Sequence, residues 1–308
     1  VPIFAVYSGG GRPIFLCAMI VIHDPACADF GSAERPEQPA RVIKTAELLR
    51  ANHPDWEWQM PARAADETVL LAHEAGLLAR LRKAEDFDDD TPFFPNIADH
   101  ALASVGGALA AMDHALAGRR AFSLMRPPGH HATRSRAMGF CYLNQVAIAA
   151  LEARRRGIAR VAVWDFDAHH GNGTDEILAG AAGTFYVSVH QSPCYPGTGL
   201  RPEDNCVNFP VVPRTSREAL LELLRTSWNA LLAFHPDLVL VSAGFDAYAL
   251  DPVVHLTLET ADFGILGRWV RESGLPTAAV LEGGYSTDLP LLVDAFLTAW
   301  DAPPAPPR

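Results

Sequence analysis

The hydrophobic residues of this chain follow two patterns in turn: short continuous apolar runs, which predict strands, and apolar residues at helical spacing, which predict helices. Apolar runs rich in β-branched residues predict buried strands at Met19–Ile22, Ala121–Met125, Val161–Trp164, Phe185–Val189, Leu238–Val241 and Ala278–Leu281. Apolar residues at helical spacing predict helices at Gln38–Ala51, Ala98–Ala117, Gln145–Arg156, Arg217–Phe234, Leu258–Glu272 and Leu289–Trp300. Strands that are apolar throughout belong to sheets covered on both faces. The pattern therefore predicts a single α/β domain, with an open, mostly parallel sheet and helices on both faces.

The two ends of the chain depart from this pattern. Residues 1–18 are a possible leader or upstream segment, because Arg12 precedes the apolar run Ile14–Ile22 and Met19 could be the start. The same run can also be a first buried strand, and we favour this interpretation because no small-x-small cleavage site follows it. Residues 302–308 form a proline-rich tail that we expect to fray. The domain is therefore expected to span residues 19–301.

Composition and charge narrow the classes of function. The 308 residues are 49% hydrophobic and 20% charged, which is ordinary for a globular protein. The formal net charge of −11 disfavours binding to nucleic acid and favours cationic partners such as lysine-rich segments or polyamines. No apolar stretch approaches eighteen residues, so we expect no membrane span. The five cysteines form no CxxC pair, which predicts a reducing compartment, the cytoplasm.

Polar clusters follow five of the predicted strands. Because the carboxyl ends of parallel strands share one edge of a sheet, these clusters are expected to meet there and form an active site. In chain order, they are Arg126–His131, Asp165–His170, His190, Ser242–Asp246 and Glu282–Tyr285.

The cluster after the third strand has the residue types of a metal site. In an extended chain, residues i, i+2 and i+4 share a face, so Asp165, Asp167 and His169 are expected to point the same way. Carboxylate and imidazole ligands bind one divalent cation, and imidazole favours zinc or a transition metal over magnesium. Asp246, at another strand end, adds a third ligand. A hydrogen-bonded polar turn without a metal is the alternative.

A site of this kind needs a separate general base. Two carboxylates and a neutral imidazole cancel the charge of the cation, so its water stays less acidic than the pKa of about 7 reached with three histidines. The consecutive His130 and His131 could take and return a proton, with Asp165 and Asn172 as candidate acceptors for their second nitrogens. The alternative is a pair of loop histidines that are merely hydrogen-bonded.

The motifs, taken in order, resemble the zinc-dependent deacetylase family, which comprises histone deacetylases, acetylpolyamine amidohydrolases and acetoin-utilisation proteins. The resemblance is strong over Arg126–Tyr285 and weaker back to about Met19. It implies an arginase/deacetylase-like fold and an amidohydrolase. Asn172, where other members have Asp, resembles the bacterial, class II-like branch. The motifs are Arg126–His131, Gly139–Asn144, Asp165–Thr174, Ser242–Asp246 and Glu282–Tyr285.

The resemblance implies roles for the residues that match. One catalytic zinc is implied on Asp167, His169 and Asp246. The implied catalytic residues are His130, His131, Asp165, Asn172 and Tyr285, with the Tyr285 hydroxyl donating to the substrate carbonyl. A structural K⁺ or Na⁺ is implied at Asp165, Asp167, His169, Ser188 and Val189. Substrate contacts are implied at the rim acid Asp90, at the aromatic channel walls Phe140 and Tyr195, and at Gly139 and Gly283.

Acetyl-lysine in a protein or peptide is the expected substrate, hydrolysed to acetate and a free amine with His131 as the base. A small acetylated amine such as an acetylpolyamine is the alternative. Polyamine-selective relatives that carry a gatekeeper acid place it after Asp-Pro, whereas here Val253 follows Asp251-Pro252.

Two other interpretations are weaker. A non-catalytic acyl-lysine binding protein would be expected to have lost a metal ligand, the histidine pair or the tyrosine. A dinuclear manganese site of the arginase type needs an acid where this chain has Gly171. The sequence makes no prediction of oligomeric state.

Overall fold

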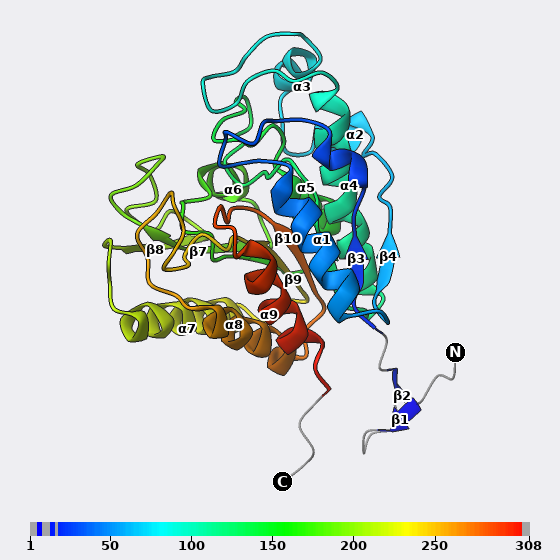
Figure 1. Ribbon diagram of the computed structural model, residues 1–308, viewed down its shortest axis with the longest axis vertical. Coiled ribbons are helices and arrows are strands. Elements are labelled where there is room, and N and C mark those ends of the chain that lie inside the picture. The colour runs from blue at the N-terminus through cyan, green and yellow to red at the C-terminus, as the bar shows by residue number, and fades with distance from the viewer. Residues whose placement is uncertain (1–4, 8–12, 16–17, 304–308) are drawn as a thin grey trace.

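A computed structural model describes residues 5–7, 13–15 and 18–303. Within them, the main sheet has eight strands that are all parallel, in the order β4-β3-β5-β10-β9-β6-β7-β8 (Figure 1). The strands are β3 (Ile20–Ile22), β4 (Glu57–Gln59), β5 (Ala121–Ser123), β6 (Val161–Asp165), β7 (Thr184–Gln191), β8 (Cys206–Val211), β9 (Leu238–Ala243) and β10 (Thr277–Leu281).

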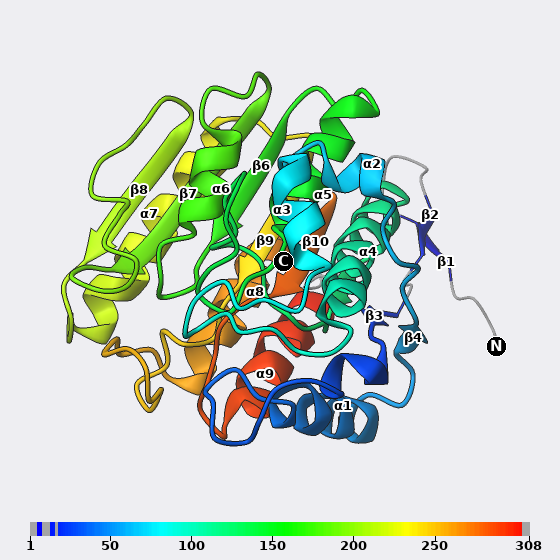
Figure 2. The same ribbon diagram turned by 90° about the horizontal axis from the view of Figure 1, so that it is seen from above.

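Helices cover both faces of this sheet (Figure 2). One face packs against α1 (Ala40–Asn52), α7 (Arg217–Ala233), α8 (Thr260–Ser273) and α9 (Leu289–Asp301). The other packs against α2 (Asp66–Val69), α3 (Ala75–Leu81), α4 (Ile97–Leu116), α5 (Gln145–Arg155) and α6 (Asn172–Leu178). A short 3₁₀ helix, η1 (Pro25–Ala28), follows β3.

Successive strand residues enter two separate hydrophobic cores, one on each face. In β6, Ala162 and Trp164 pack with the α7–α9 side, whereas Val161 and Val163 pack with the α4–α5 side. Because side chains alternate across a strand, a strand buried on both faces has to be apolar at every position. The predicted α/β domain with a covered parallel sheet is confirmed.

The predicted strands and helices are present, with ends shifted by a few residues. Two strands of the main sheet and the short helices α2, α3 and α6 escaped prediction. β4 has only three residues, and Glu57 and Gln59 are exposed, so it lacks an apolar run. β8 contains Pro210, which an edge strand tolerates but which reads as a strand breaker.

The expected strand over Ile14–Ile22 is wrong. Pro13–Phe15 forms β2, which pairs antiparallel with β1 (Ala5–Tyr7) in a separate two-stranded sheet. Only Ile20–Ile22 joins the main sheet, beside β4 and β5. The prediction of a leader or upstream segment at residues 1–18 concerns, in part, residues 1–4, 8–12 and 16–17, which lie outside the described residues. The prediction of a frayed tail concerns, in part, residues 304–308, which also lie outside them. In the part of the chain that the structure describes, no helix combines the length and apolarity needed to cross a bilayer.

The sheet order brings five functional strand ends together. Strands β5, β10, β9, β6 and β7 are neighbours in this order, and all of them are parallel. Their carboxyl ends carry the polar clusters that the sequence places after five strands. The chemistry of the molecule is therefore concentrated at one edge of the sheet.

Candidate active site

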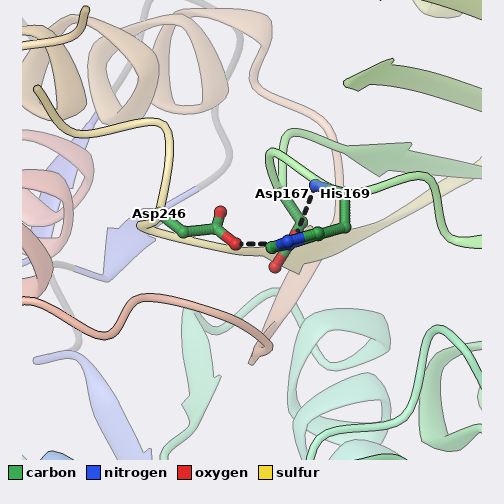
Figure 3. Close-up of side chains that lie close together, drawn as sticks. All are labelled: Asp167, His169 and Asp246. Atoms are coloured by element: carbon green, nitrogen blue, oxygen red, sulfur yellow. Dashed lines mark hydrogen bonds and ion pairs between the residues drawn. The ribbon is translucent and has the colours of Figure 1, made fainter. Parts of the chain in front are cut away.

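Three potential metal ligands meet at the carboxyl ends of β6 and β9. Ligand atoms of Asp167, His169 and Asp246 lie within 4.8 Å of one another, and all three residues are buried. Figure 3 shows the Asp246 carboxylate directed at the His169 ring, with Asp246 Oδ2 2.8 Å from His169 Nδ1. The nearer oxygen of Asp167 lies 3.2 Å from the same nitrogen. One cation could therefore contact two carboxylates and an imidazole.

Backbone N–H groups orient both carboxylates of this cluster. Asp167 Oδ2 accepts a hydrogen bond from the N–H of Gly283 at 2.7 Å, and Asp246 Oδ1 accepts one from Ala168 at 2.7 Å. A Cβ atom at position 283 would lie 2.5 Å from Asp167 Oδ2 and 2.6 Å from Asp246 Oδ2. Glycine is therefore required where the chain passes the cluster just after β10, because any side chain would collide with two ligand oxygens.

The charges of the cluster fit a bound cation. Burial and the negative charge of Asp167 raise the pKa of Asp246 to about 7, because two carboxylates share one buried site. A divalent cation among these oxygens would remove that repulsion. The mixture of one imidazole and two carboxylates, with positions left over for water or substrate, suits a catalytic metal.

One geometric expectation about this segment is wrong. Strand β6 ends at Asp165, and Asp167 and His169 lie in bends beyond it. Alternation along an extended chain therefore does not align the three side chains. Asp165 contacts His130 Nδ1 and the Tyr186 hydroxyl, whereas Asp167 and His169 meet Asp246; Asp167 Oδ1 also lies 3.8 Å from His130 Nε2.

The tandem histidines occupy a turn after β5, with their ring centroids 4.1 Å apart. His130 Nδ1 lies 3.1 Å from Asp165 Oδ2, and His131 Nδ1 lies 2.8 Å from Asn172 Oδ1. Because the amide nitrogen of Asn172 donates to the His131 carbonyl at 3.4 Å, its oxygen faces the ring. His131 therefore carries a proton on Nδ1, and in the neutral ring Nε2 is free to accept one. The His131 ring centroid lies 5.9 Å from that of His169.

The different partners separate the pKa values of the two imidazoles. Burial alone would lower the pKa of His130, but the charges of Asp167, Asp165 and Glu282 outweigh it and raise that pKa to about 10. Burial lowers the pKa of His131 well below its ordinary value, and the neighbouring His130 and His169 act in the same direction. These opposite shifts favour a neutral His131 and a protonated His130 at neutral pH.

Tyr285 lies two residues beyond Gly283, whose N–H group holds the Asp167 carboxylate. Its backbone N–H donates to Asp251 Oδ2 at 2.8 Å, and the Arg41 guanidinium lies 5.1 Å from its ring centroid. The ring meets that of Phe140 edge-on at 5.9 Å. Among the described residues, no side chain or carbonyl forms a hydrogen bond with the Tyr285 hydroxyl, so it is free to donate to a substrate.

Two aromatic residues flank the histidines and the tyrosine. The half-exposed Tyr195 ring packs edge-on against His131 at 5.1 Å, and Phe140 packs against Tyr285. Gly139 has φ of +56°, and a Cβ atom there would lie 2.7 Å from His131 Cδ2. Asp90 is exposed on the neighbouring loop, and it lines a small void together with Phe140. Of the expected substrate residues, Tyr195 and Gly139 therefore contact His131, whereas Phe140 contacts Tyr285.

The residues expected to hold a monovalent cation include two members of the metal cluster, Asp167 and His169, and three residues of the neighbouring strands β6 and β7. Asp165 and Ser188 stand opposite each other in the parallel pairing of β6 with β7, and Val189 follows Ser188. The Ser188 hydroxyl lies 2.8 Å from His190 Nδ1. His190 Nε2 lies 3.1 Å from the Gly199 carbonyl and must donate to it, so Ser188 donates to Nδ1. The lone pairs of the Ser188 oxygen therefore remain available.

Three residues near the site had no predicted role. Glu282 is fully buried and accepts hydrogen bonds from the turn that carries the histidines. The Tyr186 hydroxyl donates to Asp165 at 2.9 Å, and Asp251 receives the N–H of Tyr285. Of these three residues, only Glu282 had a signal in the sequence: it is an acid that directly follows an apolar strand. Because buried acids are seldom left without partners, its position indicates a specific contact.

Fold and site together define a class: α/β proteins with a buried cluster of potential metal ligands beside two consecutive imidazoles at the carboxyl ends of a parallel sheet. The Histone deacetylase domain family matches residues 35–299. The chain belongs to this family, and it is therefore an enzyme of the deacetylase type, an amidohydrolase.

The relatives and the solved structures agree with this assignment. The chain is 35% identical over 286 residues to a probable deacetylase of Methanothermobacter thermautotrophicus, covering 88% of this chain and 86% of that protein. It is 35% identical over 294 residues to the histone deacetylase-like amidohydrolase of Pseudomonas aeruginosa, covering 86% of this chain and 75% of that protein. The crystal structure of acetylpolyamine aminohydrolase from Burkholderia pseudomallei superposes with a TM-score of 0.84 at 29% identity, covering 92% and 99% of the two chains.

Proposed function

We propose that this enzyme removes the acetyl group from acetylated lysine side chains in a protein or peptide, using one zinc ion. The observation that carries the proposal is the pair of consecutive imidazoles with unlike partners beside a metal-binding cluster. His131 pairs with a neutral amide, whereas His130 pairs with a carboxylate. The two imidazoles are therefore suited to different tasks in one hydrolysis: His131 to proton transfer and His130 to the stabilisation of negative charge.

Asp167, His169 and Asp246 would hold the zinc ion, which when bound polarises the amide carbonyl and makes water more acidic. His131 Nε2 takes a proton from the attacking water and returns it to the leaving amine. The Tyr285 hydroxyl donates a hydrogen bond to the carbonyl oxygen as negative charge develops on it. His130 stays protonated through its contact with Asp165 and stabilises that charge. Water supplies the oxygen of acetate, and its two protons end on the products.

The substrate class is supported by the aromatic residues and by one missing acid. Phe140 and Tyr195 would line a channel for the apolar part of a lysine side chain, with Asp90 at its rim. Val253, and not an acid, follows Asp251-Pro252, so no carboxylate stands there to receive the distal amine of a polyamine.

We also propose a structural K⁺ or Na⁺ held by Asp165, Ser188 and the carbonyls of Asp167, His169 and Val189. The support is the direct pairing of Asp165 with Ser188 and the free lone pairs of the serine oxygen. A cytoplasmic location is supported by the four cysteines of the described residues, Cys27, Cys141, Cys194 and Cys206, which are free thiols.

An acetylated small amine is the second candidate substrate, favoured by the similarity to an acetylpolyamine aminohydrolase and by the net charge of −11. The two are separated by kcat/KM of the zinc-loaded protein on an acetyl-lysine peptide and on an acetylated polyamine, measured side by side. We expect the peptide to be preferred. Preference for the polyamine would overturn the assignment of substrate and leave the chemistry intact.

A further inference from the structure

Glu282 is a buried carboxylate that places negative charge beside His130 but takes part in no step of the proposed mechanism. It follows the last residue of β10, its exposed fraction is 0%, and its backbone N–H donates to the Ala243 carbonyl at 2.9 Å. Burying a carboxylate is costly unless its oxygens receive hydrogen bonds or a cation. What the carboxylate binds therefore indicates what it does.

The partners of this carboxylate belong to the tandem-histidine turn. Glu282 Oε2 accepts hydrogen bonds from the N–H groups of Gly129 at 2.7 Å and His130 at 3.1 Å. Oε1 lies 3.4 Å from the Ser242 hydroxyl. In the part of the chain that the structure describes, neither N–H group has another acceptor. One oxygen atom therefore satisfies both N–H groups of the turn.

An ion pair does not explain the position of Glu282. The Arg41 guanidinium contacts the Glu282 carbonyl oxygen at 2.5 Å and the Gly284 carbonyl at 2.8 Å, and it does not contact the carboxylate. Among the described residues, no lysine or arginine lies within ion-pair distance of that carboxylate. The carboxylate therefore serves as an acceptor for backbone groups.

The opposite side of the same turn is held by α6. The His130 carbonyl accepts hydrogen bonds from the N–H groups of Gly173 at 3.0 Å and Thr174 at 3.1 Å. His130 is thus fixed at its N–H by Glu282 and at its carbonyl by the start of α6. Because both imidazoles branch from this short unit, its orientation sets the direction in which they face Asp167 and His169.

We propose that Glu282 is a positioning residue for the tandem histidines, holding the Gly129–His130 turn through Oε2 so that both imidazoles face the metal-binding cluster. This inference rests on the proposed function, in which those imidazoles carry the proton and the charge. A misplacement of catalytic groups by about 1 Å can cost about 100-fold in rate. The acceptor is what matters, so an amide oxygen in the same place should serve.

The test compares Glu282→Met, which keeps the size of the side chain without an acceptor, with Glu282→Gln, which restores an oxygen. We expect Glu282→Met to lower kcat on an acetyl-lysine peptide by about 10–100-fold with KM nearly unchanged. Glu282→Gln should lose much less activity than Glu282→Met, because it keeps an oxygen acceptor and removes only one of the three negative charges beside His130. The matched control is Ser227→Ala. The Ser227 hydroxyl is equally buried and accepts a hydrogen bond from the Trp164 indole N–H at 3.0 Å, in the hydrophobic core between the sheet and α7. This substitution should leave kcat unchanged.

A second readout does not depend on activity. In protein with ¹⁵N-labelled histidine, Glu282→Met should shift or broaden the imidazole signals of His130 and His131, assigned from H130A and H131A. The signals of the buried His23 and His73, which bond to the Leu124 and Thr133 carbonyls, should stay in place. If Glu282→Met does not fold, Glu282→Asp, which withdraws the oxygen by one methylene, replaces it in both measurements.

The outcomes separate this inference from the proposed function. Wild-type kcat and unmoved imidazole signals in Glu282→Met would overturn the positioning role. Equal losses in Glu282→Met and Glu282→Gln, or an equal loss in Ser227→Ala, would overturn it as well. A wild-type protein that deacetylates neither substrate would refute the proposed function, and the imidazole signals would still decide whether Glu282 holds the turn.

Discussion

Replacing Gly283 with alanine tests the metal cluster without removing a ligand. The added Cβ would lie 2.5 Å from Asp167 Oδ2 and 2.6 Å from Asp246 Oδ2, whereas carbon–oxygen contacts ordinarily begin at about 3.3 Å. Each oxygen would therefore have to move by about 0.7 Å. Since Gly283 is not in the left-handed region, alanine causes no backbone strain there.

The expected loss follows from the tolerance of metal sites. Ligand distances are held to about 0.2 Å, so a displacement more than three times larger disrupts the site. We expect Gly283→Ala to weaken zinc binding by at least about 10–100-fold, the cost seen when the groups that orient ligands are lost. That range corresponds to about 1.4–2.8 kcal/mol of binding free energy.

The assay is the Kd for zinc, measured by competition with a chromogenic chelator, together with circular dichroism to show that the variant is folded. Gly76→Ala is the matched control, because a Cβ atom there meets nothing within 4 Å. Its zinc affinity should equal that of the wild type. A folded Gly283→Ala variant with unchanged zinc affinity would mean that the ion does not bind between Asp167 and Asp246.

Three further predictions concern the groups around the cluster. Tyr285→Phe should lower kcat by about 10²–10³-fold, the usual cost of one oxyanion donor, and unchanged turnover would remove Tyr285 from the mechanism. His131→Ala should reduce kcat/KM more than His130→Ala, because His131 is the neutral base; the reverse order would exchange their roles. Asn172→Asp should raise the pKa of His131 by placing a carboxylate beside Nδ1. Because the base must be unprotonated, the acidic limb of the kcat/KM profile should move to higher pH, and an unmoved limb would exclude His131 as the base.

The sheet was predictable from the sequence because its central strands are buried on both faces. Runs such as Val161–Trp164 and Leu238–Val241 are apolar at every position, which few other structures require. The two strands of the main sheet that escaped lie at its edges, where polar residues such as Glu57, Gln59 and Asn208 interrupt the apolar signal. Cys206–Val211 even contains a proline, which only an edge position permits.

The residue types of the site were also predictable, but their contacts were not. Polar clusters at the ends of parallel strands meet for topological reasons, so Asp167, His169 and Asp246 could be grouped without coordinates. We expected Asp165, Asp167 and His169 to share one face of an extended chain, and this was wrong. Strand β6 ends at Asp165, and Asp167 and His169 lie in bends after it. Glu282 reaches Gly129 from 153 residues away, and no periodicity encodes such a contact.

The central claim is that a metal ion at Asp167, His169 and Asp246, with His131 as base, hydrolyses an acetyl-lysine amide. The most direct measurement is acetate release from an acetyl-lysine peptide by zinc-loaded protein, by the same protein after the metal is removed, and after zinc is added back. We expect activity to disappear with the metal and to return with one zinc per chain, while zinc-loaded His131→Ala stays nearly inactive. Acetate release that survives metal removal, or zinc-loaded wild-type protein that binds the peptide without releasing acetate, would contradict the account.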